Sequence, residues 1–165
     1  LKAMEGKKIT YSDFIRIKYD QQFQRPYYMP FFANMHVLTH LNHNDYPEVS
    51  DILKALQKWD GKADIHSKGA ALVAKITTEM TERMLNDGLL PFYEVNINKD
   101  YFIEVLKTVK KDMIKHFGSI DVTLGDVQKL VRGDKEIPMS GITDVIAAMS
   151  SISYKNGKVK AEVGE

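Results

Sequence analysis

The sequence lacks cysteine, an excess of charge of either sign, and any long apolar run. The absence of Cys among 165 residues excludes disulfides, thiolate metal sites, iron–sulfur ligation and a cysteine nucleophile. A balance of 23 Lys and Arg against 22 Asp and Glu gives a formal net charge of +1, whereas nucleic acids and anionic membranes select basic surfaces. No stretch approaches the roughly 20 apolar residues of a membrane span. We therefore expect a globular chain with no nucleic-acid and no membrane partner.

Both ends of the sequence are abrupt. Leu1 is not an initiator methionine, and residues 1–8 contain no apolar stretch typical of a signal peptide. Residues 158–163 alternate polar and apolar side chains as a half-buried strand does, and the sequence stops two residues later. Because a strand needs a partner, we expect the chain to be an excised part of a larger protein.

Capping residues and apolar spacing predict a series of helices. Five positions are expected to cap helices: Thr10, Asp45, Ser67, Asn98 and Thr123. Thr10 and Thr123 are each followed three residues later by Asp, as in a capping box. Three glycines are expected near helix ends: Gly61, Gly88 and Gly118.

The apolar positions predict which helix faces are buried. After Thr10, Phe14 and Ile17 give a partly apolar face. The helix after Asp45 should bury Val49, Ile52, Leu53, Leu56 and Trp59. The helix after Asn98 should bury Phe102, Val105, Leu106, Val109, Met113, Ile114 and Phe117, and expose Lys107, Lys110, Lys111 and Lys115. A short helix after Thr123 is expected to continue through Leu130 and Val131.

The C-terminal part has the pattern of a hairpin. Asn156-Gly157 is a type I′ turn signal between two alternating segments, residues 151–154 and 158–163. We expect a mainly α chain with a small C-terminal β hairpin. The predicted division is a helical region over residues 1–133 and a loop and hairpin segment over residues 134–165.

Histidine is the only candidate for metal or acid–base chemistry. His36, His40 and His43 follow helical spacing, but Val37 stands where a zincin has Glu, which favours helix-end histidines over a metal site. His66 lies beside Asp64 and Ser67. Neighbouring residues in a loop seldom form a triad, so Ser67 is expected to cap a helix instead.

The remaining short motifs favour structural interpretations. Arg132-Gly133-Asp134 matches an adhesion tripeptide but also ordinary turn chemistry. Residues 125–130 could form a DNA-recognition helix, although no basic face surrounds them. Four aromatic residues could line an acyl pocket or belong to the core: Tyr27, Tyr28, Phe31 and Phe32. No nucleophile motif, phosphate loop or paired carboxylate appears, so the sequence offers no catalytic, cofactor-binding or metal-ligating residue.

Several segments resemble, in order, the penicillin acylase family of N-terminal-nucleophile hydrolases, which includes acyl-homoserine lactone and aculeacin-type acylases. The segments are residues 9–14 with Tyr19-Asp20; Leu53, Leu56, Trp59-Asp60-Gly61, Asp64, Ser67 and Gly69-Ala70-Ala71; and Leu124-Gly125-Asp126-Val127, Arg132-Gly133-Asp134, Ile137-Pro138 and Ser140-Gly141. Three positions depart from the family pattern. Leu124 stands where Trp is common, Ile142 stands where a second Gly is common, and His66 is the residue before Ser67.

The resemblance implies that the chain is the C-terminal part of a β chain. The parent would be an αββα amidohydrolase whose N-terminal Ser acts as nucleophile, with its own α-amino group as base and an Asn in the oxyanion hole. None of these residues matches a position here, and the family's calcium site is also expected outside this chain. Asp20, Trp59, Asp60, Asp64 and Ser67 would then be fold-determining contacts and caps, with Gly133 and Gly141 at turns.

Further expectations follow from the resemblance. The partners would be the remaining α and β segments of the acylase, the substrate a small acyl amide, and the location periplasmic or secreted. The alternative is a stand-alone helical interaction domain that binds a partner through the aromatic surface of residues 27–32.

Overall fold

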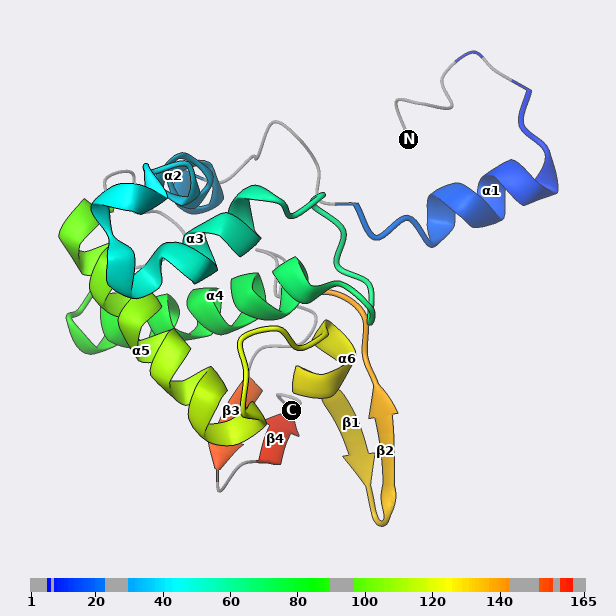
Figure 1. Cartoon of the computed structure of the whole chain (residues 1–165). Coiled ribbons are helices and arrows are strands. Elements are labelled where there is room, and N and C mark those ends of the chain that lie inside the picture. Colours follow the sequence, from blue (N-terminus) through cyan, green and yellow to red (C-terminus); the bar gives the residue numbers. More distant parts are fainter. Residues whose placement is uncertain are drawn as a thin grey trace.

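The computed structural model describes residue 6 and residues 8–22, 30–89, 97–142, 152–155 and 158–161. The chain is mainly helical (Figure 1), which confirms the expected fold class. In order, the elements are α1 (Tyr11–Lys18), α2 (Pro30–Thr39), the 3-10 helices η2 (His43–Asp45) and η3 (Pro47–Val49), α3 (Ser50–Gln57), α4 (Lys68–Asn86), α5 (Lys99–Phe117), α6 (Leu124–Val127), and strands β1 (Lys129–Arg132), β2 (Lys135–Pro138), β3 (Ile152–Lys155) and β4 (Lys158–Ala161).

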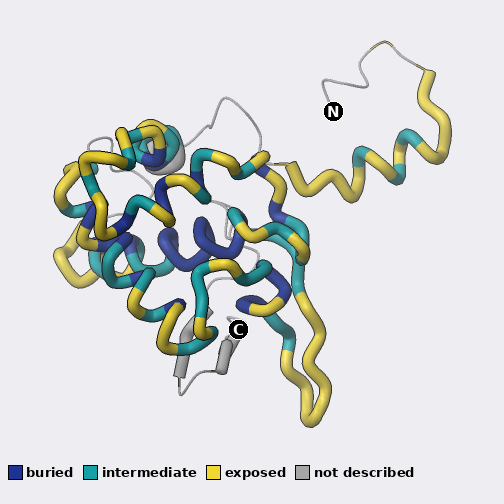
Figure 2. The backbone as a smooth tube through the Cα atoms, viewed as in Figure 1, coloured by how far each residue is buried: buried dark blue, intermediate teal, exposed yellow. Residues whose placement is uncertain are grey.

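Helix α4 is the centre of the core (Figure 2). It contacts α3, α5 and α6, and every residue from 70 to 77 is buried. Lys75 is the charged exception at 7% exposure, with its ammonium 3.8 Å from the carboxylate of Asp112 on α5. Burial lowers the pKa of Lys75, although Asp112 opposes this shift.

The predicted caps are confirmed at four helix starts and two helix ends, one of which is Gly88 with φ +74° after α4. The Ser67 hydroxyl accepts a hydrogen bond from the Ala70 N–H at 3.1 Å, and Thr10 and Asp13 form a capping box. Asn98 accepts from the N–H of Asp100 at 2.8 Å. The capping box of Thr123 is also present, and Gly118 ends α5 in the left-handed conformation. These contacts satisfy backbone groups that a helix end leaves without partners.

The helix expected to begin at Asp45 is broken, and Asp45 is not its cap. The chain instead forms η2 up to Asp45, then η3 with Pro47 in its first turn, and α3 begins only at Ser50 without a side-chain cap. Proline lacks the N–H that a continuous helix would use, and it disfavours helical backbone at Tyr46. The expected apolar stripe is nevertheless buried, except that Trp59 lies half-buried beyond the helix end.

The prediction that the short helix after Thr123 continues through Leu130 and Val131 is also wrong. Helix α6 ends at Val127, and Leu130 and Val131 belong to β1, which pairs with β2 in the register Leu130↔Ile137 and Arg132↔Lys135. Gly133 occupies the turn with φ +61°, a conformation that favours glycine, so its expected turn role is confirmed. Because α6 has only four residues, the DNA-recognition helix considered over residues 125–130 does not form.

The C-terminal hairpin forms as expected, with β3 and β4 antiparallel and Lys155 opposite Lys158. Residues 156–157, to which the type I′ prediction applies, lie outside the described residues. Strand β4 also contacts β1. The division between residues 133 and 134 falls in the turn of the β1–β2 hairpin and stays a prediction.

Three expectations about exposed and buried faces need correction. Helix α1 buries none of its residues, so the partly apolar face of Phe14 and Ile17 is not covered by the described part of the chain. Ile114, expected inside, is 49% exposed. Two of the four supposedly solvated lysines join α5 to the preceding elements: Lys107 pairs with Glu48 at 3.1 Å, and Lys110 with Asp51 at 2.9 Å.

Candidate functional site

Segments far apart in the sequence meet at the loop between α3 and α4. The N–H of Leu124 donates to the Ser67 carbonyl at 2.9 Å, and the N–H of Gly125 donates to the Ile65 carbonyl at 2.8 Å. The N–H of Gly141 donates to the Ala63 carbonyl at 2.7 Å. We call this region, formed by residues 59–70, 123–128 and 139–142, the junction.

The segment after α1 also joins the junction. The N–H of Ala63 donates to the Gln21 carbonyl at 3.0 Å, and the Gln22 side-chain amide donates to the Asp60 carbonyl at 3.0 Å. The carboxylate of Asp20 accepts from the N–H of Gln22 at 3.0 Å and so fixes the turn that presents these groups. This is the contact role that the resemblance assigns to Asp20.

Trp59 anchors the junction through its indole. The Nε1–H donates to the Lys62 carbonyl at 2.9 Å, as expected for a large aromatic residue with one polar group. The ring lies so close to α4 that a Cβ on Gly69 would be 2.5 Å from Trp59 side-chain carbons. Trp59 packs against the small buried cluster of Ala70, Ala74 and Leu124. Only a residue without a side chain fits at position 69.

The carboxylates of the junction bind backbone groups. Asp60 accepts from the N–H of Lys62 at 2.9 Å, and Asp64 accepts from the N–H of His66 at 2.8 Å. Each bond spans two residues and closes an Asx turn. Asp60 and Asp64 therefore shape the loop, as the resemblance implies.

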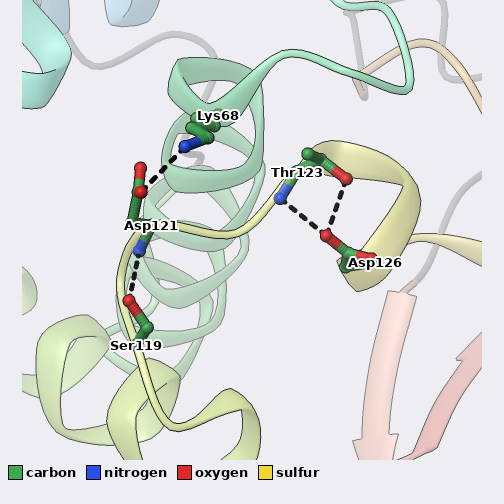
Figure 3. A network of polar contacts seen from close by, with 5 residues as sticks. All are labelled: Lys68, Ser119, Asp121, Thr123 and Asp126. Carbon is green, nitrogen blue, oxygen red and sulfur yellow. Dashed lines mark hydrogen bonds and ion pairs between the residues drawn. The ribbon is translucent and has the colours of Figure 1, made fainter.

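A second polar network holds α6 and the start of α4 (Figure 3). Thr123 donates to Asp126 from its hydroxyl at 2.7 Å and from its N–H at 2.9 Å. These hydrogen bonds lower the pKa of Asp126. Lys68 pairs with Asp121 at 2.8 Å, and the N–H of Asp121 donates to the Ser119 hydroxyl at 2.9 Å.

Gln128 links the two strands that leave the junction, a role that the sequence did not reveal. It is 4% exposed, and its amide donates to the carbonyls of Met139 at 3.2 Å and Gly141 at 2.9 Å. The N–H of Met139 returns a hydrogen bond to the Gln128 carbonyl at 3.0 Å. Gly141 has φ +98°, which confirms its predicted turn conformation.

The histidines do not form a reactive site in the described part of the chain. The rings of His36 and His40 are in edge contact at 4.5 Å, and Nδ1 of His40 lies 2.8 Å from the His36 carbonyl oxygen. Among the described residues, no group of three or more potential ligands could hold a metal ion. Asp64 contacts the backbone of His66 and Ser67 caps α4, so these neighbours act as a turn and a cap.

The predicted aromatic surface is only partly within the described residues. Residues 27 and 28 lie outside them, and Phe31 and Phe32 belong to α2. The adhesion-like tripeptide occupies the exposed turn between β1 and β2, where Gly133 and Asp134 connect the strands.

Comparison with known proteins gives one family match for the chain. The family model described as penicillin amidase matches residues 1–158. No curated protein matches the chain in sequence. None of the helices in the described ranges combines the length and the apolar character needed to cross a membrane.

Proposed function

The chain belongs to the penicillin amidase family, and from this membership we propose that it is an architectural part of an acyl-amide hydrolase whose catalytic groups lie outside it. The match covers residues 1–158, nearly the whole sequence. The proposed role is to hold the helical part of a β chain together and to return the chain toward the catalytic core.

The junction is the observation that carries this proposal. Parts of the segments that resemble the family meet there, and their polar groups are bound to the backbone or used as caps: Asp60 and Asp64 in turns, Ser67 at α4, and Asp126 at α6. Side chains that already hold a loop in shape are poorly suited to moving protons in a reaction. This use of the family segments supports an architectural rather than a catalytic role.

The proposed parent reaction is acyl transfer from an amide to water through an acyl-enzyme. An N-terminal Ser would attack the carbonyl carbon, with its α-amino group accepting the hydroxyl proton, because a serine hydroxyl is a weak nucleophile without an adjacent base. An Asn side chain and a backbone amide would stabilise the oxyanion. The proposed partners are the remaining α and β segments, the proposed calcium site lies outside this chain, and the proposed location is periplasmic or secreted.

The encoding DNA provides the first test. The reading frame upstream of Leu1 is expected to encode a Ser directly after a processing point and, further on, an Asn for the oxyanion hole. An upstream frame with neither residue would overturn the proposal. A frame that begins at this segment, with a cooperatively folding product, would favour the stand-alone interaction domain instead.

A further inference from the structure

A groove of about 820 Å³ lies beside the junction, between α3, the start of α4 and the loop after α5. This volume is within the range of small-molecule sites. The residues that line it include Lys54, Lys58, Trp59, Asp60, Asp64 and Leu72.

The apolar part of the groove is built around Trp59. The indole is half-buried with its N–H bound to Lys62, and Leu72 and Ile120 line the same space. An aromatic ring held in this way offers an apolar surface to a ligand's side chain at little entropic cost. Gly69 leaves the ring close to the first turn of α4.

The charged groups of the groove fall into two sets. Asp51 and Asp121 are already paired, with Lys110 at 2.9 Å and Lys68 at 2.8 Å. Lys54 and Lys58 make no ion pair with the described residues, and their i, i+4 spacing places them on one face at the end of α3. This wall of the groove therefore offers two ammonium groups to a ligand.

The opposite charge lies on the loop that follows α3. Asp60 and Asp64 each use one carboxylate oxygen to accept a backbone N–H, at 2.9 and 2.8 Å. Within the described ranges, the second oxygen of each carboxylate has no hydrogen-bond partner. The groove thus combines an apolar surface, two available ammonium groups and two available carboxylate oxygens.

We propose that this groove binds a short zwitterionic peptide with an apolar side chain. The peptide carboxylate pairs with Lys54 and Lys58, its terminal ammonium pairs with Asp60 and Asp64, and its apolar side chain contacts Trp59. The proposal is independent of the acylase assignment because it depends only on the groove residues.

Titration of the chain with the tripeptide Gly-Leu-Phe tests the proposal. Trp59 is the only tryptophan, so its fluorescence reports directly on the groove. We expect a saturable change with half-saturation on the order of 1 mM, as for a weak ligand. The C-terminal amide and the N-acetyl derivative of the peptide are each expected to bind about fivefold more weakly, the size of one exposed ion pair.

Variants of the charged groove residues show which residue binds each terminus of the peptide. Lys58→Met is expected to weaken the free peptide about fivefold and leave its amide unaffected, whereas Asp64→Asn should weaken the free peptide but not its N-acetyl derivative. The matched control is Lys111→Met, which removes an exposed lysine on α5 outside the groove. Circular dichroism confirms that each variant is folded. No saturable signal, equal binding of all three peptides, or an equal loss in Lys111→Met would overturn the proposal.

Discussion

Gly69→Ala tests whether the contact between Trp59 and α4 determines the stability of the junction. Alanine normally improves a helix relative to glycine by up to about 1 kcal/mol, so an open site would be stabilised. Here the new Cβ would lie 2.5 Å from carbons of Trp59, a distance at which the backbone or the indole must move. Overpacking of this kind costs about 1–3 kcal/mol, so we expect a net loss of about 1–2 kcal/mol.

Urea denaturation followed by Trp59 fluorescence measures this loss. With a slope of about 2 kcal/mol/M, the midpoint is expected to fall by about 0.5–1 M. Gly125→Ala is the graded comparison, because its Cβ would lie 3.0 Å from the Ile65 carbonyl oxygen and should cost less. Gly118→Ala has no neighbour within 4 Å, so a loss of stability there would reflect its φ of +73° and not overpacking, and the native fluorescence should be unchanged. A Gly69→Ala chain as stable as the wild type, or more stable, would refute the packing role of Gly69.

Three further outcomes are expected from the same denaturation assay. Thr77→Val removes a buried hydroxyl that has no hydrogen-bond partner among the described residues and should raise the free energy of unfolding by about 1 kcal/mol; a loss would contradict this. Gln128→Met removes the donor to two carbonyls and should lower stability by about 1–3 kcal/mol; no change would contradict the linking role of Gln128. The pKa of Asp126 is held below 3.8, so its stabilisation is complete above pH 3.8 and is lost as the pH falls through the lower pKa of the folded chain. The stability advantage of the wild type over Asp126→Asn should therefore shrink on acidification, and an advantage that grows in acid would contradict this.

The features that were predicted correctly depend on interactions within a single turn of the chain. Thr10 with Asp13 and Ser67 with Ala70 form hydrogen bonds within three residues, so the local sequence suffices to locate these helix starts. The same holds for Gly118, whose left-handed conformation ends α5. The segments that resemble the family could also be recognised from the sequence, because their order and spacing along the chain are themselves a sequence pattern.

The errors arise where competing local signals or distant contacts decide the structure. Asp45 and Pro47 both suit a helix start, and the sequence does not reveal that the chain forms two 3-10 turns before α3. Leu130 and Val131 fit a helical period, but pairing with β2 places them in a strand. The hydrogen bonds that close the junction leave no local signal in the sequence. The bond from the Gly125 N–H to the Ile65 carbonyl, for example, joins residues 60 positions apart.

Covalent labelling of the complete processed enzyme tests the architectural role most directly. A sulfonyl fluoride that reacts with an activated serine, followed by peptide mass spectrometry, locates the nucleophile. We expect a single adduct on an N-terminal Ser of a peptide outside this sequence, with loss of acyl-amide hydrolysis in proportion to labelling. An inactivating adduct on a residue of this chain would contradict the assignment of its catalytic groups to another segment.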